Sequence, residues 1–240
     1  MIYHADCREI LPLLPDKSVD LVLTDPPYGV GVDYGTGKES DRRSIEWLLP
    51  VLAECRRISA VTVWSPGTVN MVEWISSTAP YWVGVWHKVN QCSRSPLGFG
   101  AWEPICFYFD SGLGEYAHLG QDSWSIPIAQ QSEAQGHPCP KLLKFWRMLI
   151  ASDSSSIIDP FMGSGTTLVA AKQLGRRAIG IEIQEKYCEI AVNRLRQEML
   201  DFEPSREKRE LEQLSLLQQS GHPDQDGLKM AIEERSVLAR

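Results

Sequence analysis

The stretch "SIIDPFMGSGTTLVAAKQLGRRAIGIEI" at residues 156–183 decides the fold. It begins with an apolar run, turns at Gly163 and Gly165, continues with a helical pattern, and ends in a second apolar run that carries Glu182. Glycine has no side chain, so a turn built on it can bend tightly and bring its backbone close to a ligand. The stretch therefore predicts a strand–turn–helix–strand unit with a ligand at the turn.

Three kinds of ligand compete for such a turn. A phosphate-binding P-loop needs a lysine after the second glycine, where Thr166 stands, and a dinucleotide fold calls for a third glycine where Leu168 stands. A cofactor with adenosine but no pyrophosphate needs a close turn and an acid for the ribose hydroxyls. Glu182, 23 residues after Asp159, is placed to be that acid. This pattern favours S-adenosylmethionine, with a nicotinamide oxidoreductase as an outside alternative.

Strand and helix patterns alternate along the rest of the chain. Apolar runs typical of strands lie at 1–5, 19–24, 60–64, 81–88 and 104–110, and helical patterns at 7–14, 40–58, 68–76, 140–152 and 185–200. Alternation of this kind predicts an α/β fold with a mostly parallel, doubly wound, Rossmann-like sheet and helices on both faces. We expect a catalytic domain at 1–203 with a short irregular insert at 110–136, followed by a charged helix or tail at 204–240.

Composition limits the class of protein. The chain has 240 residues, 43% of them hydrophobic, and no apolar run long enough to cross a bilayer. The N-terminus lacks a signal-peptide pattern, which predicts a cytoplasmic protein without a membrane partner. Its six cysteines are scattered without a C-x-x-C pair, so the sequence predicts reduced thiols and no metal site.

The net charge of the chain does not decide whether it binds nucleic acid. The formal charge of −7 does not favour strong nonspecific binding, but local basic patches matter more than the total. Candidate patches lie at 38–43, 87–94 and 141–147.

A second stretch, "VDLVLTDPPYGVG" at residues 19–31, places an acid, two prolines and a tyrosine directly after a buried strand. Each proline fixes φ and has no N–H to donate, so the peptide cannot continue the strand. The sequence therefore predicts that Asp25 and Tyr28 are held rigidly at a strand end.

Together "DPPY" at 25–28 and "DPFMGSGTT" at 159–167 resemble the catalytic and cofactor motifs of the S-adenosylmethionine-dependent DNA amino-methyltransferases. These enzymes methylate adenine N6 or cytosine N4, and the resemblance covers roughly residues 1–200. The catalytic motif precedes the cofactor motif, as in the permuted β-group. The resemblance implies the methyltransferase variant of the Rossmann-like fold, S-adenosyl-L-methionine as cofactor and double-stranded DNA as substrate.

Catalytic roles follow from the same resemblance. The target base is rotated out of the helix, because its amine cannot be reached inside a duplex. Asp25 and the carbonyl oxygen of Pro26 are expected to accept the two N–H groups of that amine. Pro27 helps to hold the peptide rigid, and Tyr28 is expected to stack on the base. Such preorganised acceptors localise the nitrogen lone pair toward the methyl group.

Cofactor contacts are implied for a larger set. Asp6 resembles the acid that contacts the cofactor adenine, and "HPCPK" at 137–141 resembles a segment that lines its methionine end. The expected cofactor residues are Asp6, His137, Pro138, Lys141, Asp159, Phe161, Gly163, Ser164, Gly165, Thr166 and Glu182. Structural readings stay open for Asp6 as a strand-end acid, His137 as a helix cap and Lys141 as a solvated lysine.

The substrate prediction is adenine N6, because "DPPY" is more typical of adenine enzymes. Cytosine N4 is the alternative, and a catalytically inactive DNA-binding remnant is a further one. The insert at 110–136 stands where larger relatives carry a target-recognition domain. A homodimer, a restriction endonuclease partner and a bacterial or phage origin are all compatible with the resemblance.

Overall fold

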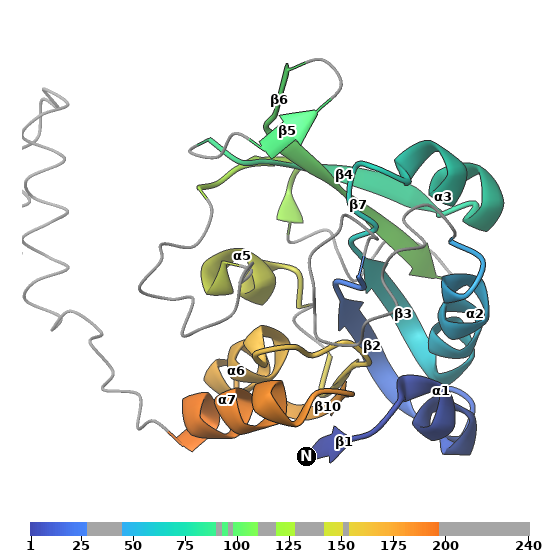
Figure 1. The fold of residues 1–240 in the computed structure, drawn as a ribbon, viewed down its shortest axis with the longest axis vertical. Coiled ribbons are helices and arrows are strands. Elements are labelled where there is room, and N and C mark those ends of the chain that lie inside the picture. The colour runs from blue at the N-terminus through green and yellow to red at the C-terminus, as the bar shows by residue number, and fades with distance from the viewer. Residues whose placement is uncertain are drawn as a thin grey trace, which may run out of the picture. The chain divides into compact units, whose positions relative to one another are not determined.

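The computed structural model describes residues 1–27, 45–89, 93–95, 98–109, 119–127, 142–150 and 154–196 (Figure 1). All of them belong to one compact unit, Met1–Gln197. The predicted tail at 204–240 lies outside the described residues, so the proposed boundary after residue 203 stays a prediction.

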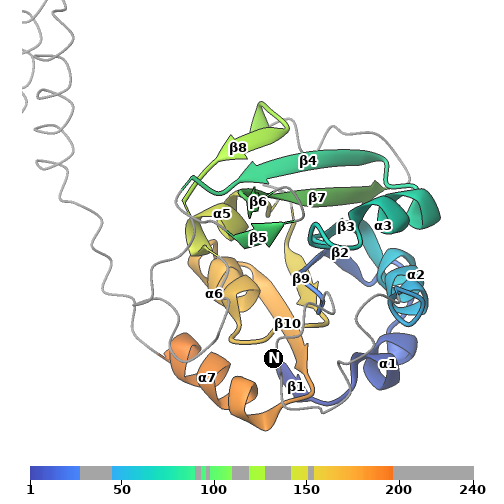
Figure 2. The same ribbon diagram turned by 45° about the horizontal axis from the view of Figure 1, so that its top comes forward.

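One sheet of eight strands organises this unit, in the order β1-β10-β9-β2-β3-β7-β4-β8. Its strands are β1 (Ile2–His4), β2 (Val19–Thr24), β3 (Ser59–Trp64), β4 (Trp82–His87), β7 (Trp102–Phe109), β8 (Ser123–Ser125), β9 (Ser156–Asp159) and β10 (Arg177–Glu182). Only β7 among them runs opposite to its neighbours, β3 and β4. Figure 2 shows β8 beside β4 at one end of the sheet and β1 beside β10 at the other. The predicted doubly wound, mostly parallel sheet is confirmed.

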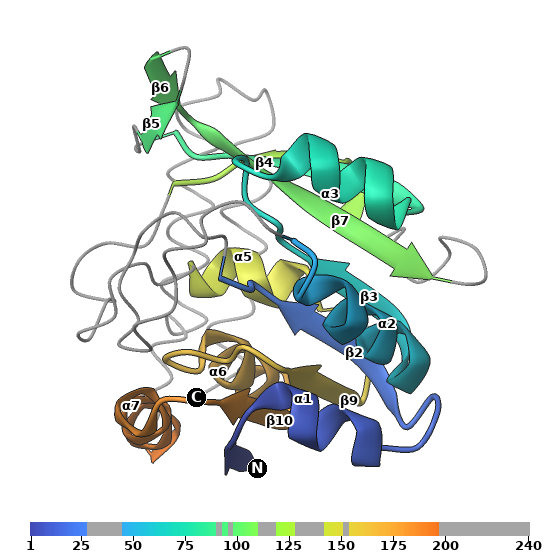
Figure 3. The ribbon, with the colours of Figure 1, turned by 45° about the vertical axis from the view of Figure 1, so that its right-hand side comes forward.

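Helices cover both faces of the sheet (Figures 1 and 3). One face carries α1 (Cys7–Ile10), α2 (Leu48–Ile58) and α3 (Met71–Thr78), and the other carries α5 (Leu143–Met148), α6 (Thr166–Gln173) and α7 (Glu185–Arg196). Each face buries its own apolar cluster, one with Val51, Leu52 and Trp74 and one with Phe145, Trp146 and Ala170. The side chains of β2 point alternately to the two faces and pack in both clusters, as expected for a strand buried on both faces.

The first helices begin and end for local reasons. A short 3₁₀ turn, η1 (Leu11–Leu13), follows α1, because Pro12 cannot continue the hydrogen bonding of an α-helix. In α2, Pro50 lies in the first turn, where its missing N–H removes no helical bond. The buried positions of α2 recur at helical spacing and are Leu48, Val51, Leu52, Cys55 and Ile58.

The structure differs from the sequence prediction in the insert. The sequence predicts that 110–136 is irregular, but Ser123–Ser125 form β8, which pairs in parallel with β4 and buries Trp124. The rest of the sequence between Phe109 and Leu142 is described only at 119–127. A second sheet, β5 (Ser93–Ser95) with β6 (Gly98–Gly100), was also not predicted.

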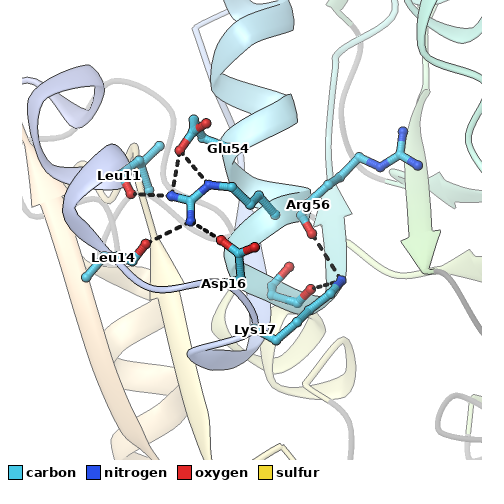
Figure 4. Close-up of polar contacts among 8 residues, drawn as sticks. Leu11, Leu14, Asp16, Lys17, Glu54 and Arg56 are labelled. Atoms are coloured by element: carbon cyan, nitrogen blue, oxygen red, sulfur yellow. Dashed lines mark hydrogen bonds and ion pairs between the residues drawn. The ribbon is translucent and has the colours of Figure 1, made fainter.

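Polar contacts fasten the end of α2 to the turn before β2, away from the carboxyl ends of the strands (Figure 4). Arg57 donates hydrogen bonds to the carbonyl oxygens of Leu11 and Leu14 and to the carboxylates of Asp16 and Glu54. Lys17 Nζ donates to the carbonyl oxygens of Arg56 and Ser59, at 3.2 and 2.8 Å. These bonds satisfy carbonyls at the end of a helix, where no N–H of the helix itself is available.

Candidate active site

The reversal of strand order lies between β9 and β2. From β9 the chain passes through α6 to β10 on one side, and from β2 it passes through α2 to β3 on the other. The two strands pair in parallel, with Leu21 opposite Ile157 and Val22 opposite Ile158. Ligands of open α/β sheets bind outside the carboxyl ends of strands at such a switch point. The peptide at Asp25 and the glycine turn after Asp159 leave the sheet at this place.

Asp159 joins the two motifs directly. Thr24 donates its hydroxyl to Asp159 Oδ1 at 2.6 Å, and Thr167 at the start of α6 donates to Oδ2 at 2.5 Å. The N–H of Phe161 also bonds to Oδ1, at 3.1 Å. Burial raises the pKa of Asp159 to about 6, although these hydrogen bonds act in the opposite direction. Asp159 is 4% exposed, and its oxygens are occupied by the chain itself.

The glycine turn has the backbone that its sequence predicts. Gly163 and Gly165 have φ of 50° and 80°, in the left-handed region that favours glycine. A Cβ on Gly165 would lie 2.8 Å from the Cβ of Ala191, so this glycine also allows α6 and α7 to pack closely. The N–H of Gly163 donates to Glu182 Oε2 at 2.9 Å.

Glu182 closes the turn from the end of β10. Its second oxygen, Oε1, accepts the N–H of Gln184 at 2.9 Å. Burial raises the pKa of Glu182, and the two backbone donors partly offset that effect. Each carboxylate oxygen accepts one of these bonds and has a further lone pair for a hydroxyl donor. This geometry fits a group that accepts hydrogen bonds from a ribose.

Arg194 was not among the residues predicted from sequence. From α7 its guanidinium donates to the carbonyl oxygen of Ser164 at 2.7 Å, and also to the hydroxyls of Ser164 and Thr166, at 3.1 and 3.2 Å. These two predicted cofactor residues therefore bond to a helix behind the turn. An arginine in a charged helical pattern gives no sequence signal for this role.

Phe161 belongs to an aromatic cluster beside the turn. Its ring packs edge-on against Trp64 at 6.1 Å and against Trp47 at 6.0 Å between centroids. Trp64 in turn stacks on Trp74 at 5.1 Å. The cluster fixes the turn against the end of β3, and a cofactor contact by Phe161 stays a prediction.

Asp6 follows the strand that pairs with β10 and has a local partner. The N–H of Ala5 donates to the carbonyl oxygen of Glu182 at 3.0 Å, which places Asp6 just beyond this strand end. Asp6 caps α1 by accepting the N–H of Arg8 at 2.9 Å and forms an ion pair with its side chain at 2.5 Å. Hydrogen bonds from Arg8 lower the pKa of Asp6. A contact with the cofactor adenine stays a prediction.

Asp25, Pro26 and Pro27 follow β2 as predicted, with Pro26 buried and the other two half-buried. The N–H of Ser65 bonds to the carbonyl oxygen of Thr24 at 3.1 Å and holds this peptide against the end of β3. Four predicted residues lie outside the described residues: Tyr28, His137, Pro138 and Lys141.

No helix among the described residues is long and apolar enough to cross a membrane. The described residues also contain no group of three or more His, Cys, Asp or Glu side chains that could hold a metal ion.

The candidate basic patch at 87–94 includes a lysine that is buried in the structure. Lys88, in the stretch 87–94, is 7% exposed and forms an ion pair with Glu103 on β7. Its ammonium also lies 5.3 Å from the ring of Trp86. Since this charge is buried and paired, Lys88 does not contribute to a basic surface. The patch at 38–43 lies outside the described residues.

Comparison with known proteins gives a consistent result. A family model for N6/N4 DNA methylases matches residues 113–193. The chain is 32% identical over 204 residues to a putative methylase of Escherichia coli K12, YubD, covering 80% of this chain and 88% of the relative. It is 28% identical over 248 residues to the Type II methyltransferase M.HinfI of Haemophilus influenzae, covering 82% of this chain and 68% of the relative.

Solved structures share the fold. A putative DNA modification methylase of Thermus thermophilus, TTHA0409, complexed with S-adenosyl-L-methionine, has a TM-score of 0.60 at 23% identity and covers 84% of this chain and 95% of its own. The cytosine-N4-specific PvuII DNA methyltransferase has a TM-score of 0.61 at 19% identity, covering 86% and 88%. These likenesses confirm the predicted methyltransferase type of Rossmann-like fold.

Proposed function

The chain belongs to the N6/N4 family of S-adenosylmethionine-dependent DNA amino-methyltransferases, and we propose that within this family it methylates the N6 amine of adenine in duplex DNA. The "DPPY" tetrapeptide at 25–28 supports adenine. So does a relative described as a DNA adenine methyltransferase, YhdJ of Escherichia coli K12, which is 28% identical over 243 residues.

The single observation that carries methyl transfer at a shared site, whichever base is the substrate, is the bond between Thr24 and Asp159, at 2.6 Å. It ties the residue before Asp25 to the residue that opens the glycine turn. A base held by the first peptide and a cofactor held by the second would therefore meet at one edge of the sheet.

The described residues fit the adenosine part of the cofactor. Glu182 would accept hydrogen bonds from the ribose hydroxyls, and the turn at Gly163 and Gly165 would let the backbone approach the cofactor closely. When bound, S-adenosylmethionine supplies a methyl group on a positively charged sulfur. Asp159 is assigned as a positioning residue, because it is 4% exposed and both of its oxygens accept bonds from the chain.

The catalytic chemistry falls to the peptide at 25–27. Asp25 accepts one N–H of the target amine and the carbonyl oxygen of Pro26 accepts the other, so the nitrogen lone pair is directed toward the methyl group. As the new N–C bond forms, the bond between the methyl carbon and sulfur would break, and the nitrogen would become positively charged. The Asp25 carboxylate would stabilise this charge until the nitrogen loses one proton to water. Tyr28 stacks on the extruded base.

Partners follow from the same reading. Relatives described as Type II methyltransferases support pairing with a restriction endonuclease of the same recognition sequence. Self-association as a homodimer and an intracellular site of action remain predictions.

The test is direct identification of the product. Purified protein is incubated with labelled S-adenosylmethionine and unmethylated duplex DNA, and the DNA is digested to nucleosides. Labelled N6-methyladenine is expected. N4-methylcytosine would replace the substrate proposal, and a complete absence of label would support the inactive remnant.

Asp25→Asn tests the catalytic assignment. Asparagine keeps one acceptor oxygen but loses the negative charge that stabilises the developing positive charge on nitrogen, so kcat should fall on the order of 100- to 1,000-fold, with S-adenosylmethionine binding retained. Asp122→Asn is the matched control, because Asp122 is exposed at the start of β8 and accepts one bond from Trp82. The control should keep wild-type kcat. Equal activities of the two variants would remove Asp25 from the mechanism.

A further inference from the structure

Ser65 is the first residue after β3, the strand beside β2. The two strands pair in parallel, with Thr24 opposite Trp64. The next residues along each chain are Asp25 and Ser65, and the N–H of Ser65 bonds to the carbonyl oxygen of Thr24 at 3.1 Å. Ser65 therefore borders the catalytic peptide at the same edge of the sheet.

The Ser65 hydroxyl is buried without a partner. Ser65 is 2% exposed, and its Oγ has no hydrogen-bond partner in the part of the chain that the structure describes. Other buried hydroxyls are satisfied: Ser59 bonds to the carbonyl oxygen of Cys55 at 2.8 Å, and Thr78 to that of Trp74 at 2.7 Å. Burying an unpaired polar group opposes folding, so such a group calls for an explanation.

Its position in the chain is rigid. Pro66, with its fixed φ, and Gly67, with φ of 67°, follow Ser65, and both are buried. A hydroxyl held in this way is preorganised for a group that the chain itself does not supply.

Two indole N–H groups also lack a partner among the described residues, but their surroundings differ. Trp64 Nε1 belongs to a ring packed between Trp74 and Phe161, and Trp124 Nε1 to a ring in the apolar cluster around Phe145. Both rings contribute to the hydrophobic core. Ser65 lies instead beyond a strand end, beside the peptide assigned to catalysis.

We propose that Ser65 Oγ donates a hydrogen bond to the ring nitrogen next to the exocyclic amine of the extruded base. This inference rests on the proposed function. That nitrogen is N1 in adenine and N3 in cytosine, and in both bases it is an acceptor beside the amino group. Asp25 accepts from the amine while Ser65 donates to the nitrogen, so the pair reads two adjacent atoms of the Watson–Crick edge.

The pair would select bases whose amine is at C6 of a purine or C4 of a pyrimidine, next to a ring nitrogen without a hydrogen. In thymine and guanine a carbonyl oxygen stands at this position. That oxygen and the carboxylate of Asp25 are both hydrogen-bond acceptors, so they would repel each other. Their neighbouring ring nitrogen carries a hydrogen, so it cannot accept from Ser65. Adenine and cytosine satisfy both groups, and the inference therefore holds for either product of the labelling test.

Ser65→Ala is compared with Ser59→Ala, a buried serine at the other end of the same strand. Ser59 is hydrogen-bonded, so its loss should lower the melting temperature and leave kcat/KM of the folded enzyme unchanged. Ser65→Ala should keep or raise the melting temperature, because it removes an unpaired buried hydroxyl, and should keep the affinity for S-adenosylmethionine, measured by titration. Its kcat/KM on DNA should fall about tenfold, as expected for the loss of one buried hydrogen bond at about 1.4 kcal/mol. Unchanged kcat/KM would overturn the proposal.

A substrate analogue isolates the bond itself. In an oligonucleotide with the identified target, adenine is replaced by 1-deazaadenine, or cytosine by 3-deazacytosine, which removes the acceptor nitrogen. Wild type should lose activity on the analogue, while Ser65→Ala should show little further loss, because the two changes remove the same bond. Independent, multiplicative losses would overturn the inference. Failure of the DNA methyltransferase activity on which the inference rests is distinct, since wild type would then methylate neither adenine nor cytosine.

Discussion

Asp159 shows how a residue predicted to contact a cofactor also holds the fold together, and its cofactor contact stays a prediction. Its place in a cofactor motif predicts contact with a ligand, yet Thr24, Thr167 and the N–H of Phe161 occupy its oxygens. A buried carboxyl that serves as an internal acceptor keeps a charge that burial opposes, and for this reason its pKa is raised to about 6. The residue can thus influence both motifs without touching a substrate.

The raised pKa of Asp159 predicts a specific pH dependence of stability. The pKa is about 6 in the folded chain against 3.8 for an ordinary aspartate, so the folded state binds more protons between these values. The contribution of Asp159 to the free energy of unfolding therefore decreases as pH rises through this window. In the neutral variant Asp159→Asn this dependence is lost. The stability of wild type relative to the variant should be higher at pH 4 than at pH 7 by roughly 2–3 kcal/mol.

Urea unfolding of both proteins at several pH values checks this prediction. The difference between the two proteins is informative, because the other carboxylates titrate in both and cancel. A difference that is constant from pH 4 to pH 7 would mean that Asp159 has an ordinary pKa in the folded protein.

At the scale of elements, the glycine turn depends on how closely α6 and α7 pack. Gly165→Ala places a Cβ 2.8 Å from that of Ala191 and also strains a φ of 80°. Gly175→Ala is the matched control, because its φ of 68° is similar but nothing lies within 4 Å of the added atom. We expect a loss of about 1 kcal/mol for the control from backbone strain, and a further loss of roughly 1–3 kcal/mol for Gly165→Ala from overpacking.

Denaturant unfolding measures the stability of both glycine variants, and titration with S-adenosylmethionine measures binding. Only Gly165→Ala should weaken binding, since only that change moves the start of α6. Equal effects of the two substitutions would show that the contact with Ala191 is easily relieved.

The elements that sequence predicts well are those whose signal is local. The apolar run at 19–24 and the turn between Asp159 and Thr166 carry strong patterns, and β2 and the start of α6 appear as expected. By contrast, β8 has three residues with one buried side chain, too few for a period to be recognised. It forms by pairing with the edge of β4. The roles of Arg194 and Ser65 depend likewise on tertiary neighbours, which no local pattern contains.

At the scale of the whole unit, two segments distant in sequence share one sheet through the pairing of β2 with β9. Polar bonds fasten both ends of this pair. At the carboxyl end Thr24 bonds to Asp159, and at the amino end Asp20 Oδ2 accepts the N–H groups of Ser155 and Ser156, each at 2.8 Å. The hydroxyl of Ser156 adds a third bond, at 2.9 Å. Burial opposes ionisation of Asp20, but these bonds outweigh it and lower its pKa.

Asp20→Ala should therefore destabilise the whole unit and not one half alone. Loss of hydrogen bonds to a charged group is expected to lower the free energy of unfolding by about 2 kcal/mol at pH 7. Because the folded pKa of Asp20 lies below its unfolded value, the difference from wild type should shrink as pH falls through the folded pKa.

Asp16→Ala is the control: Asp16 is exposed and pairs with Arg57 at the surface, so its loss should lower stability by less than about 1 kcal/mol. Calorimetry should show one transition for each protein, since β2 and β9 share a core. Two separate transitions in Asp20→Ala would mean that the catalytic and cofactor halves fold independently, and that their common edge is not fixed by the sheet.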